Sequence, residues 1–172
     1  MKLLVCASLS LLSVAANAAD IVRYPLPDND KFPIANAVAV PAGTTLVFQS
    51  GTTASPKNPS APPGTSDYWG DTKTQAASAL ANIKKSLASE GLDFGDVVKM
   101  LVFIVGDPAK GGKMDFKGFM EAYTQYFGTP EQPNLPARSA IQVAGLATPG
   151  ALIEIEVVLA KKSAKMPAKK AP

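Results

Sequence analysis

The sequence contains no histidine, and its single cysteine, Cys6, lies close to the N-terminus. These absences exclude Ser-His-Asp and Cys-His nucleophile systems, and they exclude zinc sites built on histidine or cysteine. Any catalysis must therefore use carboxylates, arginine, lysine, hydroxyl groups, backbone groups and water.

Long apolar runs are also scarce, and the clearest one occupies the N-terminus. A lysine precedes an apolar stretch over residues 3–14, and residues 16–18 (ANA) supply the small side chains of a cleavage site. This pattern is typical of a secretory signal peptide over residues 1–18, cut before Ala19; the alternative is a buried N-terminal helix. We expect an exported protein, periplasmic in a Gram-negative source. The stretch is short for a membrane span, so no stable membrane association is expected.

Positive charge is scarce in the body of the chain, although the formal net charge is +3. Of the 17 basic residues, six lie in the leader or in residues 161–172, which leaves 11 basic against 14 acidic residues. Because nucleic-acid-binding proteins carry positive charge as a patch on the fold, we expect no nucleic acid as a partner. The tail, residues 161–172, is rich in Lys, Ala and Pro and is predicted to be disordered.

A single domain of strands and helices is predicted over residues 19–160, after an irregular, proline-containing stretch up to Phe32. Asp71 and Asp115 are predicted to cap two helices, each ended by a glycine. The second helix carries an apolar stripe: Phe116, Phe119, Met120, Tyr123 and Phe127. Five strands are predicted, the first two and the last two as hairpins: residues 35–40, 44–51, 96–106, 137–145 and 151–160. This order indicates an α+β sandwich with both helices on one sheet face.

A long loop with four prolines is predicted over residues 52–70. Loops of this length in compact domains often form lids or rims of functional sites. Tyr68 and Trp69 at its end either wall a pocket or pin the loop to the body of the protein.

Arg138 heads an apolar strand in the stretch NLPARSAIQVAGL, and its guanidinium stays charged at any working pH. A symmetric hairpin of the last two strands would put four polar residues on the sheet face away from the helices: Arg138, Gln142, Glu154 and Glu156. Such a face suits a cleft or a subunit interface, so we expect a homo-oligomer. Arg138 can hold a carboxylate and Glu154 can move protons to or from water; the alternative is an internal Arg–Glu pair.

The stretch NLPARSAIQVAGL, followed by LIEIEVVLA, resembles the closing signature of the RidA/YjgF family. These proteins are enamine/imine deaminases that older descriptions call endoribonuclease L-PSP. The resemblance spans residues 35–160 and includes VFQSG (residues 47–51) and the segment of residues 82–107. PARS, IEIE and GL-x-x-GDVVK are specific in combination, although each alone is weak.

The resemblance implies a chorismate-mutase-like α+β fold: a two-layer sandwich of a mixed sheet and two helices, assembled as a homotrimer with sites between subunits. It implies hydrolysis of reactive 2-enamino and 2-imino acids to 2-keto acids and ammonia, without metal or other cofactor. The family's carboxylate-binding arginine falls on Arg138 and its water-activating glutamate on Glu154. Ser50 and Gly51 match the segment that lines the pocket.

The sequence departs from the family at three pocket positions. The usual cysteine is Ala140, a frequent asparagine aligns with Met120, and a frequent tyrosine before the first hairpin has no clear match. We still expect backbone groups near Ala140, together with Tyr68 and Trp69, to shape the substrate site. Two other functions stay open: a non-catalytic trimeric binding module for small carboxylates, and the ribonuclease of the older name. The acidic body and the absence of histidine argue against the ribonuclease.

Overall fold

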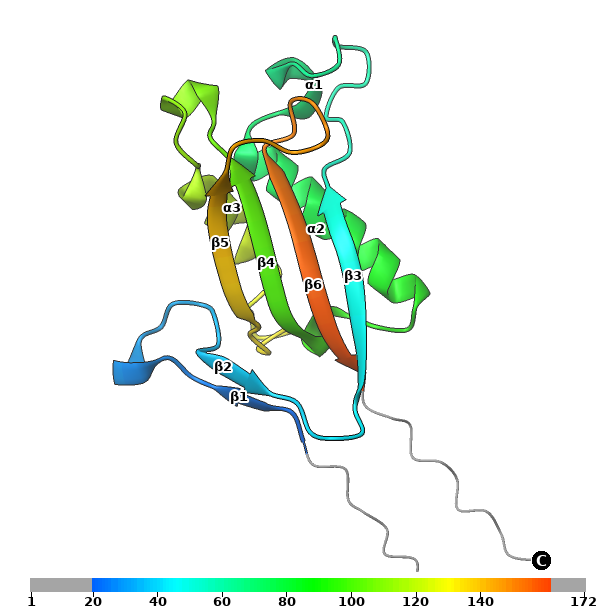
Figure 1. Ribbon diagram of the computed structural model, residues 1–172, viewed down its shortest axis with the longest axis vertical. Coiled ribbons are helices and arrows are strands. Elements are labelled where there is room, and N and C mark those ends of the chain that lie inside the picture. The colour runs from blue at the N-terminus through cyan, green and yellow to red at the C-terminus, as the bar shows by residue number, and fades with distance from the viewer. Residues whose placement is uncertain (1–19, 162–172) are drawn as a thin grey trace, which may run out of the picture.

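The computed structural model describes residues 20–161, in which a four-stranded sheet is covered on one face by two helices (Figure 1). The strands are β1 (Val22–Tyr24), β2 (Ala37–Ala39), β3 (Thr45–Thr53), β4 (Val97–Val105), β5 (Ala137–Val143) and β6 (Ile153–Lys161). The helices are α1 (Ser66–Trp69), α2 (Thr72–Ser89) and α3 (Phe116–Tyr123), and short 3-10 turns are η1 (Pro27–Asn29), η2 (Phe94–Asp96) and η3 (Pro108–Lys110). The predicted leader and the tail after Lys161 lie outside the described residues. Within residues 20–161, no helix has the length and apolar character needed to cross a membrane.

The main sheet has the strand order β3-β6-β4-β5. β6 pairs antiparallel with β3 and β4, whereas β4 and β5 run parallel. A parallel pair requires a crossover connection, and α3 lies in the segment that makes it. β4 was predicted from its apolar run as a central strand, and this prediction is confirmed.

Both long helices begin where the sequence predicts. The Asp71 carboxylate accepts a hydrogen bond from the Thr74 amide at 2.8 Å, and the Asp115 carboxylate accepts one from the Gly118 amide at 3.0 Å. These are N-cap bonds, which satisfy amides that the first helical turn leaves without partners. α3 ends earlier than predicted, at Tyr123, although its stripe continues into the core through Phe127.

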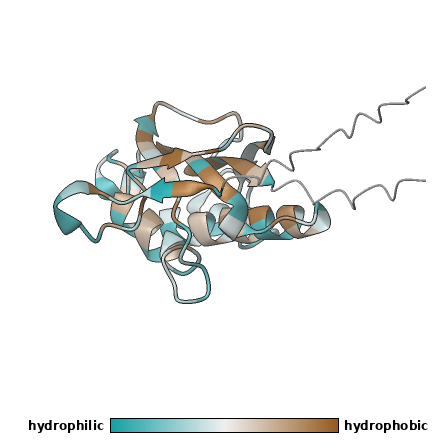
Figure 2. Cartoon of the chain, turned by 90° about the horizontal axis from the view of Figure 1, so that it is seen from below, coloured by the Kyte–Doolittle hydropathy of each residue, from teal (hydrophilic) through white to brown (hydrophobic). Residues whose placement is uncertain are grey.

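The hydrophobic core lies between the sheet and the helices. Alternate residues of β6 are fully or almost fully buried there: Ile153, Ile155, Val157 and Leu159. This orientation of β6 confirms the prediction made from its alternating pattern, and it leaves Glu154 and Glu156 on the other face. Figure 2 shows the same distribution, with hydrophobic residues along strands and helices and hydrophilic residues in the outer loops.

The predicted hairpin between residues 35–40 and 44–51 is wrong. β2 instead pairs antiparallel with β1, in a segment predicted to be irregular, and β3 pairs with β6. The two-stranded ribbon of β1 and β2 projects below the main sheet in Figure 1. The three-residue strand β1 lies before Pro25, the first proline of this segment, so the prolines do not interrupt it.

The predicted hairpin of the last two strands is also wrong. β5 pairs with β4, and β6 lies on the other side of β4. The connection between them, residues 144–152, passes the end of β4, so no symmetric turn couples the faces of the two strands. Arg138 and Gln142 consequently face the helices, opposite to the prediction, while Ser139 and Ile141 point outward and are exposed.

The proline-rich loop begins after β3 and ends in α1, so residues 52–70 are not wholly irregular. The Trp69 indole N–H donates to the Pro149 carbonyl at 2.9 Å, and the side chain is buried. Trp69 therefore pins the loop to the β5–β6 connection, which is the structural role considered for it.

Candidate active site

Arg138 occupies the second position of β5 and points toward α3. Its guanidinium carbon lies 4.3 Å from the centre of the Tyr123 ring and 5.0 Å from that of Phe119. The rings of Phe32 and Phe116 lie at 5.4 and 5.8 Å. We call these four rings the aromatic cage of Arg138. Contact with ring faces stabilises the cation without supplying a hydrogen-bond acceptor.

One nitrogen of the guanidinium, Nη1, is buried and has no hydrogen-bond partner among residues 20–161. In the same range, no carboxylate forms an ion pair with Arg138, so the internal Arg–Glu pair considered above is not formed within the chain. Burial lowers the pKa of Arg138, and the neighbouring Tyr123 opposes that shift. A buried cationic donor without an acceptor is costly, and an anionic ligand would relieve that cost.

Glu154 lies on the opposite side of the sheet. It is half-buried on the outer face of β6, where its neighbours across the strands are Phe103 of β4 and Thr53 of β3. A Cβ atom at Gly51 would overlap the Glu154 carboxylate, so a larger residue there would force this side chain to move. Ser50 and Gly51 form an irregularity in the β3–β6 pairing, which places both beside Glu154.

The predicted site residues thus fall into two groups on opposite faces of one sheet. Arg138 and Ala140 belong to the helix side, where Ala140 packs against the core. Glu154, Ser50 and Gly51 belong to the outer face. Within one chain, the sheet separates the proposed carboxylate-binding group from the proposed proton-transfer group. A joint site requires two copies of the chain.

Tyr68 and Trp69 lie away from Arg138. Trp69 binds the connection that follows β5, whereas Arg138 is at the start of that strand. The Tyr68 ring makes an edge-on contact with Trp69, with ring centres 4.8 Å apart. The loop aromatics are therefore nearer the end of the sheet where β6 and Glu154 begin.

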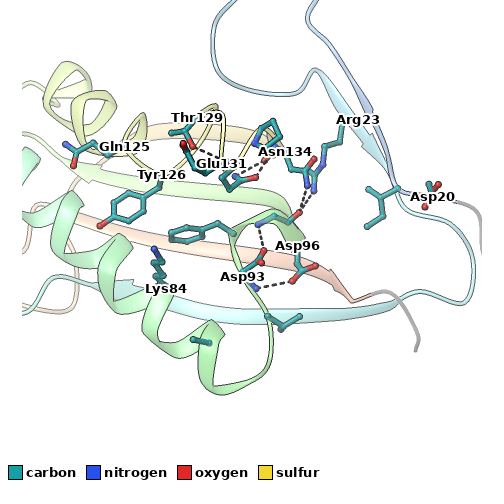
Figure 3. Close-up of a pocket in the computed structure, with 17 residues that line it drawn as sticks. Asp20, Arg23, Lys84, Asp93, Asp96, Gln125, Tyr126, Thr129, Glu131 and Asn134 are labelled. Atoms are coloured by element: carbon teal, nitrogen blue, oxygen red, sulfur yellow. Dashed lines mark hydrogen bonds between the residues drawn. The ribbon is translucent and has the colours of Figure 1, made fainter. Parts of the chain in front are cut away.

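Sequence reasoning did not single out Arg23, although its guanidinium binds three backbone carbonyls. Nη1 donates to Leu135 at 2.7 Å and to Val97 at 2.9 Å. Nη2 donates to Gly95 at 2.9 Å, the bond drawn in Figure 3. The signal was available: like Arg138, Arg23 is a basic residue within a short apolar stretch, IVRYPL. Phe32 was also missed as a site residue, because nothing in the sequence brings it next to Arg138.

A groove of about 1010 Å³ lies beside Arg23, between the end of α2, the η2 turn and the segment after α3 (Figure 3). None of the predicted site residues lines it. Several of its polar groups already bind one another, as when the Asp93 amide donates to Asp96 and the Asn134 amide group donates to Gly95. The groove is thus separate from both groups of predicted site residues.

The family model described as endoribonuclease L-PSP matches residues 31–161. The chain belongs to this family. The resemblance to RidA/YjgF proteins drawn from the PARS and IEIE motifs is therefore confirmed.

Known relatives match between about half and three quarters of this chain. TdcF of Escherichia coli (strain K12) is 35% identical over 101 residues, which are 59% of this chain and 72% of TdcF. The 2-iminobutanoate/2-iminopropanoate deaminase of Rattus norvegicus is 39% identical over 89 residues, which are 52% of this chain and 57% of the rat protein. Such relatives support a deaminase role at the level of the family.

Solved structures support the fold. The crystal structure of E. coli TdcF with bound serine aligns with 72% of this chain and 85% of TdcF, with a TM-score of 0.53 and 32% identity. The E. coli YjgF gene product aligns over the same shares, with a TM-score of 0.52 and 32% identity. The predicted chorismate-mutase-like α+β fold, with a mixed sheet and two helices on one face, is confirmed.

Proposed function

We propose that the protein hydrolyses reactive 2-imino and 2-enamino acids to 2-keto acids and ammonia, without a cofactor. The observation that carries this proposal is the buried guanidinium of Arg138, which has an unpartnered nitrogen and no carboxylate beside it within residues 20–161. A planar guanidinium binds a carboxylate through two parallel hydrogen bonds, which is the geometry that a 2-imino acid offers. The serine bound to TdcF, a small molecule with a carboxylate, is in keeping with such a ligand.

In the proposed reaction, Arg138 holds the substrate carboxylate and Glu154 assists a water molecule. The water oxygen adds to C2 of the imine while its proton passes through the Glu154 carboxylate to the substrate nitrogen. The hydroxyl proton then passes through Glu154 to the nitrogen of the resulting aminoalcohol, the carbon–nitrogen bond breaks, and ammonia leaves as the keto group forms. Ser50, Gly51 and backbone groups near Ala140 shape the site, and Tyr68 and Trp69 border the Glu154 half.

The separation of Arg138 and Glu154 supports sites between subunits of a homotrimer, with one residue from each neighbour. The outer sheet face is apolar enough to favour association: Phe48 of β3 is 74% exposed, and Ile141 of β5, 43% exposed, pairs with the half-buried Phe103 of β4. Large exposed apolar side chains grouped on a sheet face are typical of an interface. We further propose that the mature protein is exported to the periplasm, on the leader pattern of residues 1–18.

A trimeric module that binds small carboxylates without turnover is the second candidate. It is favoured by Ala140 and Met120, which stand where the family has a cysteine and an asparagine. The two candidates agree on Arg138 and differ on Glu154. Binding without turnover needs no proton transfer, so Glu154→Gln would leave the affinity for a small carboxylate unchanged.

Subunit mixing tests the proposal directly. Arg138→Gln and Glu154→Gln are each expected to abolish deamination of an imino acid generated by an amino-acid oxidase and monitored with semicarbazide. If the sites lie between neighbours, refolding the two inactive variants together restores about a quarter of the sites in random trimers. Glu156→Gln is the matched control, since this exposed glutamate lies on the same strand and face.

Three outcomes would count against the proposal. Wild-type protein that releases no ammonia leaves only the binding module. A mixture that stays inactive places both residues in one chain's site. Size exclusion that shows only monomer at micromolar concentration removes the shared site altogether.

A further inference from the structure

The aromatic cage of Arg138 has a buried floor and an accessible rim. Phe119 and Tyr123 of α3 have no exposed surface, whereas Phe32 is 37% exposed and Phe116 is half-buried. The two rim rings stack on each other, with centres 6.3 Å apart and planes inclined by 20°. A ligand that approaches the guanidinium from solvent therefore meets Phe32 and Phe116 first.

The four side chains of the cage offer a ligand of Arg138 no free hydrogen-bonding group. The Tyr123 hydroxyl is the only polar group on the four rings; it donates to the Pro33 carbonyl at 2.9 Å, and its oxygen stabilises the charge of Arg138. The adjacent Ala140 contributes a methyl group to the same face of β5. A polar substrate side chain placed here would lose water without gaining a partner, whereas an apolar one would gain by burial.

Phe32 is held in place rather than left on a swinging loop. Its backbone amide donates to the Asp30 carboxylate at 2.8 Å, and the Tyr123–Pro33 bond fixes the next residue to α3. Beyond these, the Ala35 amide donates to the Pro136 carbonyl at 3.0 Å, which ties the segment to the start of β5. Because these three hydrogen bonds hold the segment around Phe32, its ring is in position before a ligand binds.

We propose that Phe32 is a specificity-determining residue that selects substrates with branched aliphatic or aromatic side chains over substrates of alanine size or with a hydroxyl group. This inference rests on the proposed binding of the substrate carboxylate by Arg138. It adds the class of side chain that the site accepts. The ring of Phe32 is the part of the cage that an entering ligand can reach, so its removal changes preference more than it changes the fold.

The test measures binding of a series of 2-keto acids, the proposed products, by calorimetry: pyruvate, hydroxypyruvate, 4-methyl-2-oxopentanoate and phenylpyruvate. We expect wild type to bind the last two about tenfold more tightly than pyruvate, which is the range that an apolar pocket achieves. Phe32→Ala should lower that ratio to about twofold while changing pyruvate affinity little, and Phe32→Leu should keep most of it. Tyr24→Ala is the matched control, because Tyr24 is 50% exposed in β1 and its ring is not one of the four that form the cage of Arg138.

The possible results separate this inference from the proposed function. An unchanged ratio in Phe32→Ala, or a wild-type preference for pyruvate or hydroxypyruvate, overturns the selectivity. Selective binding without ammonia release leaves the role of Phe32 intact and overturns the deaminase. Binding that survives Arg138→Gln, or no binding of any keto acid, overturns both.

Discussion

The two arginines of the described chain are buried in opposite ways. Arg23 donates to three backbone carbonyls from three segments, Gly95, Val97 and Leu135, and so joins the β1–β2 ribbon to the body. Arg138 lies among four aromatic rings with one nitrogen unpartnered in the described residues. Burial lowers the pKa of both, because each is partly removed from water.

The difference separates a structural cation from one available to a ligand. Arg23 has its acceptors within the fold, so its burial is compensated and contributes to stability. The cage of Arg138 brings ring faces against the cation but supplies no anion, so no opposite charge balances the guanidinium within the described residues of one chain. This contrast predicts opposite effects when each arginine is replaced.

The largest expected effect is on ligand affinity and turnover in Arg138→Gln. Loss of the charged fork should lower kcat/KM by about hundredfold to thousandfold, as for other groups that hold developing or fixed charge in active sites. The free energy of unfolding should change by less than about 1 kcal/mol, because the lost ring contacts are offset by relief of a buried charge. Steady-state kinetics and urea unfolding measure the two quantities on one preparation.

Arg23→Gln should show the reverse pattern. Three carbonyls lose a charged donor, so the free energy of unfolding should fall by about 3 kcal/mol. For a protein of this size, Tm should fall by about 6–12 °C. Calorimetry gives the Tm, and keto-acid titration at a temperature where the variant is folded should give wild-type affinity. If Arg23→Gln lost ligand affinity while it kept its Tm, the distinction between the two arginines would fail.

Tyr123→Phe tests the residue whose ring contacts Arg138 and whose hydroxyl holds Pro33, next to Phe32. The ring stays under Arg138, but the Pro33 carbonyl loses its hydrogen bond from the hydroxyl. We expect a loss of about 1 kcal/mol in unfolding free energy, measured from the denaturant midpoint. Keto-acid affinity should fall about twofold, since the segment that carries Phe32 is less firmly held. A larger loss of affinity than of stability would show that the hydroxyl touches the ligand.

The smallest expected effect is that of pH. Burial disfavours the charged form of both arginines, so their charges cost folding free energy, and that cost disappears only above their folded pKa. Because a guanidinium is not deprotonated in proteins at working pH, both arginines stay charged. Pyruvate affinity, measured by calorimetry between about pH 6 and pH 9, should therefore be constant. A midpoint in that range would assign carboxylate binding to a different group.

Local signals predicted the helices and the central strand well, because each depends on residues close together in the chain. Asp71 and Asp115 bind amides three residues later, and the alternation of β6 directly orients its own side chains. Strand pairing was predicted poorly, since neither of the two expected hairpins is formed. Sequential strands usually pair, but here β2 pairs with β1 outside the main sheet, and β4 lies between β5 and β6.

The error in pairing moved Arg138 to the wrong face. Its predicted association with Glu154 assumed that one turn coupled the parity of β5 and β6. The motifs that carry the resemblance named both residues, yet they carried no information on which side of the sheet each side chain lies. For the same reason, no local pattern could connect Phe32 with Arg138, which is more than a hundred residues away.

The sequence by itself limited the chemistry open to this protein: without histidine, any catalysis has to use carboxylates, arginine, lysine, hydroxyl groups, backbone groups and water. It also determined the helix starts and the buried faces of individual elements, since these follow from side-chain periodicity within a few residues. Only the tertiary structure decided that Arg138 and Glu154 lie on opposite faces and that an aromatic cage holds the arginine. Those relations depend on the order of strands in the sheet, which is set by packing between segments far apart in the chain.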